Sequence, residues 1–356
     1  MQIFRGHTHY RAANAGRPGC AVTIGNFDGV HRGHQAMLAL LNSEARHRNV
    51  PSCVLTFEPH PRDYFARRAG RPEAAPARIS LLRDKLTELA RCGVDQVVVL
   101  RFGAALASQS AQAFIDEVLV RSLRARYVLV GDDFRFGERR AGDYAMLDAA
   151  GDAKGPAKGP AKGQTNGQAN GQPNGLASGF DVARMMSYEV HGLRVSSSAV
   201  REALAAGDMG RCAALLGRPY AISGPVVHGA KLGRTLGFRT LNLRFAHARP
   251  AAMGIFVVRV LGLGAARVTK PLAGVASLGV RPTVDDSGRV LLEVHCLDWP
   301  AGLGTEAGYG HRISVELVHK LHDERKYGSL AALQAGIAQD TADARAWWAE
   351  RPQALT

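Results

Sequence analysis

The stretch of sequence that decides the fold runs Thr23-Ile24-Gly25-Asn26-Phe27-Asp28-Gly29-Val30-His31-Arg32-Gly33-His34. It lies between a short apolar run and an amphipathic helix that is expected over roughly 34–48. In a doubly wound α/β domain this gap is where phosphates bind, because the free N–H groups at a helix start point at the anion. Gly33 has no side chain to block the approach of a phosphate, and His31 and His34 can donate hydrogen bonds to its oxygens.

The segments around this stretch alternate between strand and helix. Strands are expected over 21–24, 51–57, 97–100 and 127–130, with helices between them whose apolar residues recur every three or four positions. Ser110 is expected to cap the helix that precedes the last of these strands. This order predicts a Rossmann-like, doubly wound parallel sheet whose ligands bind at the carboxyl ends of the strands.

The chain changes character after residue 217. Short strands separated by Gly and Pro are expected over 221–228, 240–245, 254–261, 272–279, 289–298 and 312–319, followed by a helix from near Ser329. That pattern predicts a small antiparallel β-barrel with a C-terminal helix. We therefore expect two domains, 1–217 and 218–356. Within the first, residues from about 151 to 178 form an Ala-Lys-Gly-Pro and Asn-Gly-Gln low-complexity insertion that we expect to be disordered.

Composition limits the classes of partner. The chain has 356 residues and a formal net charge of +14, yet it contains no recognisable nucleic-acid-binding module, so we expect polyphosphate substrates and no nucleic acid. No apolar stretch approaches the ~20 residues that span a bilayer, so no membrane partner is expected. The five cysteines show no Cys-x-x-Cys spacing, which predicts reduced thiols and a cytoplasmic location.

Three further strings fall where strands end or helices begin. Pro59 and His60 follow the second strand, where they form either a rigid loop or a ligand contact. Asp132, Asp133 and Phe134 follow the fourth strand, where carboxylates and an aromatic ring suit a metal, a ribose or a stacked ring system. A third string opens a later helix with Ser197, Ser198 and Arg201, which offer hydroxyls and a guanidinium to a nucleotide. The alternative for that string is an ordinary helix cap by Ser198.

In this order the strings resemble the bacterial bifunctional riboflavin kinase/FMN adenylyltransferases, also called FAD synthetases. The resemblance covers most of the chain outside the insertion. It implies an enzyme, a transferase of FAD biosynthesis, whose N-terminal module transfers AMP from ATP to FMN. It also implies catalytic roles for His31 and His34. The positions that would bind ATP and its phosphates in this module are Gly25, Asn26, Phe27, Asp28, Gly33, Ser197, Ser198 and Arg201. Those that would line the flavin site are Pro59, His60, Asp132, Asp133 and Phe134.

The second half carries a glycine-rich, basic string that leads into a strand. Gly229, Lys231, Gly233 and Arg234 could bring backbone amides and cations to phosphates. Thr240 and Asn242 share one strand face and offer oxygen ligands that suit Mg²⁺. The string resembles the riboflavin kinase motif Gly-Phe-Pro-Thr-Ala-Asn, with Arg239 in the place of the proline and Leu241 in the place of the alanine.

A Glu-x-His strand resembles the part of the kinase family that supplies the catalytic base. The resemblance implies that Glu293 takes the proton of the riboflavin 5′-hydroxyl and that Arg281 lies near the flavin. The chain departs from the family at His322, where arginine is usual, and at Gly336, where glutamine is usual.

The resemblance implies a two-step enzyme with Mg²⁺ as cofactor and with ATP, riboflavin and FMN as substrates, and flavoproteins would receive the FAD. One alternative is an FMN adenylyltransferase with an impaired kinase domain, which Arg239 motivates. Another is a nucleic-acid-binding protein on a nucleotidyltransferase scaffold, because a fold alone does not fix function.

Overall fold

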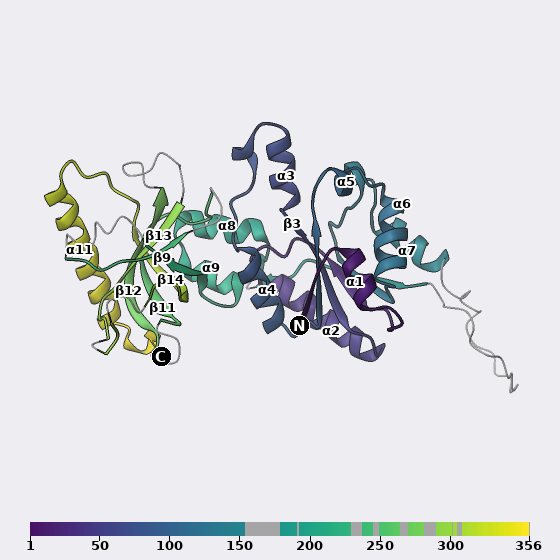
Figure 1. Ribbon diagram of the computed structural model, residues 1–356, viewed down its shortest axis with the longest axis horizontal. Helices are drawn as coiled ribbons and strands as arrows, with labels where there is room; N and C mark the ends of the chain where they lie inside the picture. The colour runs from purple at the N-terminus through teal and green to yellow at the C-terminus, as the bar shows by residue number, and fades with distance from the viewer. Residues whose placement is uncertain are drawn as a thin grey trace, which may run out of the picture. The chain divides into compact units, whose positions relative to one another are not determined.

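The structure is a computed structural model. It describes residues 1–153, 179–190, 192–228, 237–244, 249–263, 270–280, 290–300, 302–304 and 308–355. The chain divides into two compact units, Met1–Ala75 with Leu86–Tyr188, and Pro76–Lys85 with Glu189–Thr356 (Figure 1). Most of the low-complexity segment, and with it the prediction that the segment is disordered, lies outside the described residues.

The first unit is built on a six-stranded sheet in the order β1-β4-β3-β2-β5-β6, in which every pair of neighbouring strands is parallel. The strands are β1 (Gln2–Arg5), β2 (Ala21–Ile24), β3 (Ser52–Glu58), β4 (Gln96–Arg101), β5 (Tyr127–Gly131) and β6 (Asp181–Met185). The predicted strands of the doubly wound sheet are confirmed. The edge strand β1 was not predicted, because four residues with one buried side chain carry little periodic signal.

Helices cover both faces of this sheet. They are α1 (His7–Ala13), α2 (Arg32–His47), α3 (Pro61–Arg68), α4 (Leu82–Arg91), α5 (Ala104–Ala107), α6 (Ala111–Phe114) with its π-helical continuation η2 (Ile115–Ser122), and α7 (Tyr144–Ala153), with 3₁₀ turns η1 (Pro72–Ala74) and η3 (Glu138–Arg140). Side chains that alternate along a strand point to opposite faces. Val22 of β2 accordingly packs with η2, whereas Ala21 packs with α2, and two separate cores result.

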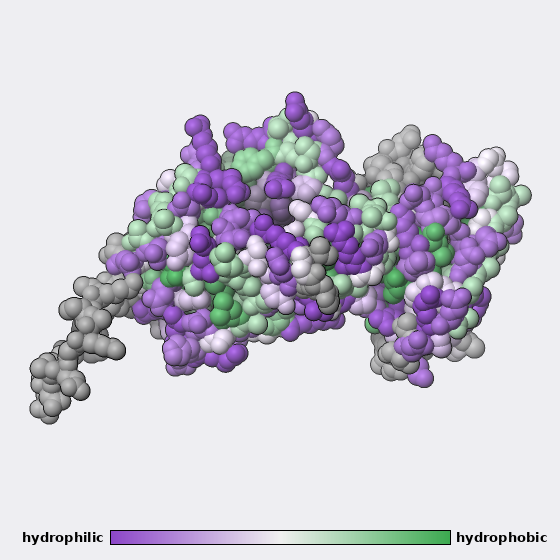
Figure 2. Space-filling model, turned by 180° about the vertical axis from the view of Figure 1, so that it is seen from behind, coloured by the Kyte–Doolittle hydropathy of each residue, from purple (hydrophilic) through white to green (hydrophobic). Residues whose placement is uncertain are grey.

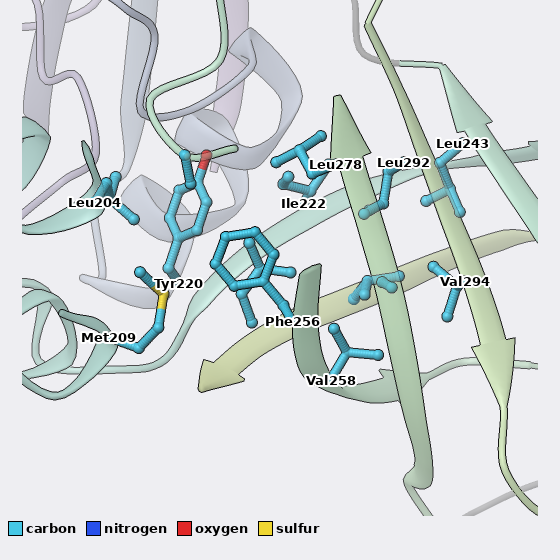
Figure 3. Packing of buried hydrophobic residues seen from close by; sticks show 14 of the residues in the cluster. Leu204, Met209, Tyr220, Ile222, Leu243, Phe256, Val258, Leu278, Leu292 and Val294 are labelled. Atoms are coloured by element: carbon cyan, nitrogen blue, oxygen red, sulfur yellow. The ribbon is translucent and has the colours of Figure 1, made fainter. Parts of the chain in front are cut away.

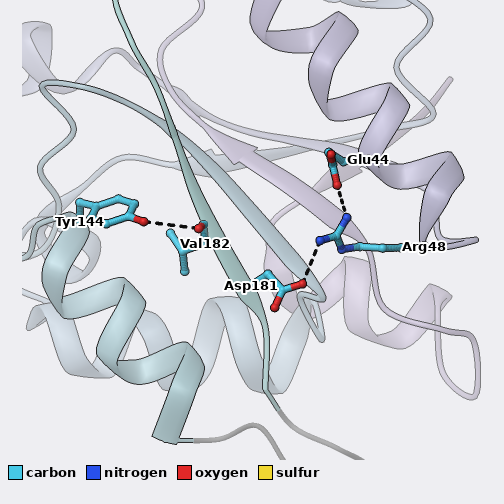
Figure 4. Close-up of polar contacts among 5 residues, drawn as sticks. All are labelled: Glu44, Arg48, Tyr144, Asp181 and Val182. Carbon is cyan, nitrogen blue, oxygen red and sulfur yellow. Dashed lines mark hydrogen bonds and ion pairs between the residues drawn. The ribbon is translucent and has the colours of Figure 1, made fainter. Parts of the chain in front are cut away.

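Strand β6, which follows the low-complexity segment, is bonded to helices on both faces (Figure 4). Arg48, at the end of α2, donates to Asp181 Oδ2 at 2.8 Å and also to the Glu44 carboxylate. The Tyr144 hydroxyl of α7 donates to the Val182 carbonyl at 3.4 Å. These contacts hold β6 between α2 and α7.

The second unit contains a closed antiparallel barrel in the strand order β10-β13-β12-β11-β14-β9. Its strands are β9 (Tyr220–Val227), β10 (Leu241–Arg244), β11 (Gly254–Leu261), β12 (Leu272–Val280), β13 (Val290–Cys296) and β14 (Arg312–His322), and a short hairpin, β7 (Glu189–Val190) with β8 (Leu193–Arg194), precedes it. The barrel and its C-terminal helix were predicted and are confirmed, with strand ends that differ by a few residues.

The described residues of this unit also form the helices α8 (Ser197–Ala206), α9 (Met209–Leu216) and α11 (Leu330–Ala349), and the 3₁₀ turn η5 (Pro352–Leu355). Leu204 and Met209 from α8 and α9 join Tyr220, Ile222 and Phe256 in the barrel core (Figure 3). These two helices therefore pack as part of the barrel unit. The predicted functional boundary at 217/218 stays a prediction, because compact packing does not say which residues serve which activity.

The C-terminal helix α11 packs against the outer surface of the barrel. Ala344 and Trp348 contact Val257, Val275 and Leu297 there. Leu330, at the start of this helix, is exposed, because the barrel contacts the second half of the helix.

Hydrophilic colouring predominates on the face of the molecule shown in Figure 2, and the hydrophobic areas on it are small and separated. Among the helices of the described residues, none has the length and apolar character needed to cross a membrane.

Candidate functional site

Strand order brings three of the predicted strings to one edge of the parallel sheet. β2 lies between β3 and β5, and all three run in the same direction, so their carboxyl ends meet. The histidine stretch follows β2, Pro59 and His60 follow β3, and Asp132 to Phe134 follow β5. The chain also reverses its winding direction between β2 and β5, which is the position where open α/β sheets bind ligands.

The two histidines of the motif form a stacked pair at the start of α2. Their ring centroids are 3.6 Å apart and the ring planes differ by 17°. His31 is the N-cap residue, and its Nδ1 accepts a hydrogen bond from the His34 backbone N–H at 3.3 Å. Because Nδ1 accepts, the proton of the neutral His31 ring resides on Nε2, which is then the donor atom. His31 thus combines a capping role with a donor at the anion-binding end of a helix.

The loop before this helix holds a strained backbone. Phe27, Gly29 and Val30 have φ values of 49°, 86° and 43°. A positive φ is rare for a phenylalanine and still rarer for the β-branched Val30, so the surrounding structure must impose it. Strain of this kind concentrates at ligand-binding loops.

Burial distinguishes the predicted ATP-binding positions of this loop. Phe27 is buried in the core, and its ring packs against the His34 ring with centroids 4.9 Å apart. Asp28 is also buried. Asn26 Oδ1 is buried and has no hydrogen-bond partner among the described residues, which makes it the clearest acceptor for a ligand N–H in this loop. Gly25 lies against Phe27, where a Cβ would come within 3.1 Å of the ring.

The string after β3 has a structural role that the sequence did not reveal. His60 is buried and caps α3, since its Nδ1 accepts from the Arg62 backbone N–H at 3.1 Å. The peptide bond before Pro59 is cis. Whether Pro59 serves a rigid loop or a flavin contact stays open. His60 has at least a structural role, because it is buried and caps α3.

An aromatic cluster at the same edge was missed by sequence reasoning. Phe102, which follows β4, meets Phe57, Tyr64 and Phe65 with ring centroids 5.9, 5.5 and 5.7 Å away, each in an edge-to-face arrangement. Phe65 remains about half exposed, at 49% of its surface. The signal was hidden because Phe102 comes from a different strand and follows no motif.

The string after β5 is tied to the end of the first unit. Ser187 Oγ donates to Asp132 Oδ2 at 2.6 Å. Phe134 stacks on Phe136 with ring centroids 5.5 Å apart. Asp133 lies beside Gly131, where an added Cβ would be 3.6 Å from Asp133 Oδ1. The structure therefore places these residues at the sheet edge, and their contacts with a flavin stay a prediction.

The serine string opens α8 in the second unit. Its N-cap is Ser196, whose Oγ accepts from the Ala199 N–H at 3.2 Å, so the alternative of a cap by Ser198 is wrong. The reason is that the extended residue before the first helical turn is Ser196. Ser197 and Ser198 lie in the first turn, and Arg201 Nε donates to the Ala77 carbonyl at 2.6 Å. The predicted nucleotide contacts of this string stay predictions.

A row of polar side chains crosses the outer face of the barrel. Asn242 of β10 lies directly opposite Glu293 of β13, and Glu293 lies opposite Ser277 of β12. Ser277 also donates to the carboxylate of Glu324, from the segment after β14, at 3.0 Å. Asn242 is buried, and its Oδ1 has no hydrogen-bond partner in the described part of the chain. An amide oxygen in this position is the kind of ligand that Mg²⁺ takes.

Other predicted kinase positions cannot be placed in this way. Gly229, Lys231, Gly233, Arg234 and Arg281 lie outside the described residues. Thr240 is half-buried and directly precedes β10. No group of three or more His, Cys, Asp or Glu side chains among the described residues could hold a metal ion.

The two departures from the kinase family both form contacts. His322 Nε2 lies 2.7 Å from Asp340 Oδ1, which joins the end of β14 to α11. Gly336 leaves room for the ring of Tyr327, which would overlap any Cβ at that position. The chain therefore uses both substitutions in its own packing.

Comparison with known proteins decides the family. The family model described as FAD synthetase matches residues 13–170, and the one described as riboflavin kinase matches residues 216–348. The bifunctional riboflavin kinase/FMN adenylyltransferase of Escherichia coli strain K12 is 43% identical over 97% of this chain and 97% of its own length. The chain belongs to the family of bifunctional riboflavin kinase/FMN adenylyltransferases. The member from Pseudomonas fluorescens is 42% identical, again over 97% of both chains.

A solved structure supports the arrangement of elements in this bifunctional family. The crystal structure of a protein from Streptococcus pneumoniae, named there as a macrolide-efflux protein, is similar with a TM-score of 0.70 and 25% identity. The match covers 97% of this chain and 99% of the streptococcal one. The FAD synthetase match covers β2 to β5 of the parallel sheet, and the riboflavin kinase match covers the barrel and nearly all of α11. The resemblance inferred from the motifs is confirmed.

Proposed function

We propose that this chain makes FAD from riboflavin in two steps. Riboflavin and ATP give FMN and ADP, and FMN and a second ATP give FAD and pyrophosphate. The observation that supports both steps most directly is the match of one chain to two family models, one for each activity. The two alternatives, an impaired kinase domain and a nucleic-acid-binding protein, are not favoured. The relatives that this chain matches over nearly their whole length are named for both activities.

In the adenylylation step an FMN phosphate oxygen attacks the α-phosphorus of ATP, and pyrophosphate leaves. His31 and His34 would donate hydrogen bonds to phosphate oxygens as negative charge develops, assisted by the positive end of α2. Asn26 Oδ1 would accept from the nucleotide, since it is buried without a partner among the described residues. The cluster around Phe102 and Phe65 offers apolar rings on which the flavin would stack.

In the kinase step the riboflavin 5′-hydroxyl attacks the γ-phosphorus of ATP, and ADP leaves. Glu293 would accept the hydroxyl proton. Thr240 and Asn242 would hold Mg²⁺, together with the nucleotide phosphates, and the ion would neutralise charge on the transferring phosphoryl group. The buried Asn242 Oδ1 opposite Glu293 is the structural observation that fits this ion.

Two features of the cellular setting are part of the proposal. The five cysteines are free thiols, which supports a reducing, cytoplasmic environment. The FAD product would pass to flavoproteins.

The test is an incubation of the full chain with riboflavin, ATP and Mg²⁺, in which FMN and FAD are separated by chromatography over time. FMN should appear first and FAD second. Formation of FAD only when FMN is supplied would show that the kinase step is absent, and formation of neither product would overturn the proposal.

A further inference from the structure

The position of Thr240 depends on more than the strand ladder. β10 begins at Leu241 and has only four residues, so Thr240 and the two residues before it lie outside the regular pairing. A metal ligand must be held to within about 0.5 Å of its productive position. Something beyond the ladder must therefore fix the segment 238–240.

A histidine on the neighbouring strand provides one such contact. His295 Nδ1 lies 2.8 Å from the carbonyl oxygen of Arg239. A carbonyl can only accept, so Nδ1 carries the proton and donates. The Phe238 ring packs edge-on against the same imidazole, with centroids 5.5 Å apart and planes at 87°. His295 is two residues from Glu293 on one strand face, so this contact joins the segment to the strand of the expected base.

A tryptophan provides the second contact. The Arg239 guanidinium carbon lies 4.8 Å from the centre of the Trp299 ring, within the range of a cation–π interaction. Trp299 is itself held, because its Nε1 donates to the Leu303 carbonyl at 2.9 Å and its ring packs against the barrel core. The Arg239 side chain thus lies against a ring that is itself held in place.

We propose that Arg239, His295 and Trp299 form a clamp that positions Thr240 and Asn242 for the metal–nucleotide complex of the kinase reaction. The proposal rests on the proposed kinase function, and all three are positioning residues. The backbone of residue 239 is held by His295 and its side chain by Trp299. The segment 239–242 is therefore fixed at both ends. At one end His295 and Trp299 hold residue 239, and at the other end Asn242 pairs with Glu293 across the strand ladder.

The experiment measures binding of Mn²⁺, a stand-in for Mg²⁺, to the full chain in the presence of ADP by electron paramagnetic resonance. The same proteins are assayed for riboflavin phosphorylation over a series of Mg²⁺ concentrations. The variants are Arg239→Gln, Trp299→Leu and the double variant. The matched control is Arg351→Gln, because Arg351 stacks on Trp347 at the same 4.8 Å distance but at the end of the C-terminal helix.

Each single variant should weaken Mn²⁺ binding, and raise the Mg²⁺ concentration for half-maximal kinase rate, by about twofold to fivefold, as expected for loss of one cation–π contact. The double variant should be no worse than the single ones, because the two side chains act as one unit. Arg351→Gln should leave both quantities unchanged. Arg239→Lys, which keeps a cation over the ring, should restore most of the metal affinity.

Two results would overturn the clamp. Unchanged metal affinity in both single variants is one. The other is a rise in KM for ATP in Arg239→Gln with no effect of Trp299→Leu, which would make Arg239 a phosphate ligand. If Trp299→Leu is poorly folded, Trp299→Phe replaces the ring by one that attracts a cation less strongly, so it should weaken Mn²⁺ binding by less than Arg239→Gln does. Failure of the wild-type chain to form FMN would overturn the kinase function, while the Mn²⁺ measurement would still decide the clamp.

Discussion

Replacement of His31 should separate two tasks that one side chain performs. Its Nδ1 caps α2 through the His34 backbone N–H at 3.3 Å, and the same ring stacks on His34 at the expected phosphate site. His31→Ala removes both the cap and the donor. His31→Asn removes the imidazole donor but supplies an oxygen that can cap the helix. His34→Ala removes the second ring and keeps the backbone N–H that the cap uses.

The expected sizes of these effects differ. Loss of an N-cap side chain costs about 1 kcal/mol, which lowers the melting temperature of a domain of about 150–250 residues by about 2–4 °C. His31→Ala should show this shift, whereas His31→Asn and His34→Ala should melt close to the wild type. Loss of one hydrogen-bond donor to a developing negative charge lowers a rate by about 10²–10³. All three variants should therefore form FAD from FMN at least about a hundredfold more slowly.

The assay follows conversion of FMN and ATP to FAD by chromatography, with thermal unfolding measured on the same samples. Formation of FMN from riboflavin is the internal control and should stay at the wild-type rate, because it depends on the barrel unit. Near-normal FAD synthesis by His31→Asn would refute the donor role of His31. Equal loss of FMN and FAD formation in a folded variant would refute the assignment of the two activities to separate units.

Three other predictions concern different parts of the chain. Glu293→Gln should stop phosphorylation of riboflavin and leave adenylylation of FMN intact, and a near-normal kinase turnover would exclude Glu293 as the base. Replacement of 154–178 by a three-residue Gly-Ser linker should preserve both activities. The reason is that Gly151 packs directly on the Phe180 carbonyl, so the two ends of the segment already lie close together. Loss of FAD synthesis without unfolding would contradict this prediction. Burial, assisted by the nearby Arg351, lowers the pKa of His319 below its ordinary value of 6.5, so the unfolded chain binds the proton more readily and stability should fall as the pH drops below about 6.5. His319→Gln should make that fall shallower in urea unfolding measured at pH 7 and pH 5, and an unchanged slope would show that His319 does not contribute.

The local signals in the sequence were sufficient for the fold class. The unbroken apolar run Val97 to Leu100 forms a buried strand of a parallel sheet, Ser110 caps its helix as predicted, and the C-terminal helix begins directly after Ser329 as predicted. Each of these depends on neighbours along the chain, through side-chain periodicity or a hydrogen bond to a residue three positions on. Such signals survive without knowledge of the tertiary structure.

Signals that depend on long-range packing were missed or misplaced. The sequence offered three consecutive serines for the cap of α8, and only the extended backbone at Ser196 selected one of them. Leu330 opens α11 with an apolar side chain that is exposed, whereas Ala344 and Trp348, near the other end of the helix, contact the barrel. Periodicity gives the direction of a helix face but does not say which part of the helix meets its neighbour.

The chemical groups and their places at strand ends and helix starts could be read from the sequence: two histidines at the start of α2, a carboxylate on β13 and an asparagine on β10. The tertiary structure decided which of these groups meet. The order of β3, β2 and β5 in the sheet brings together the strings that follow these strands, and the register of β10 on β13 places Asn242 opposite Glu293. The fold also brings Phe102, which follows β4, against Phe65 of α3. The physical reason is that strand order and register are set by burial of whole faces over the domain, whereas a motif is set by the few residues that compose it.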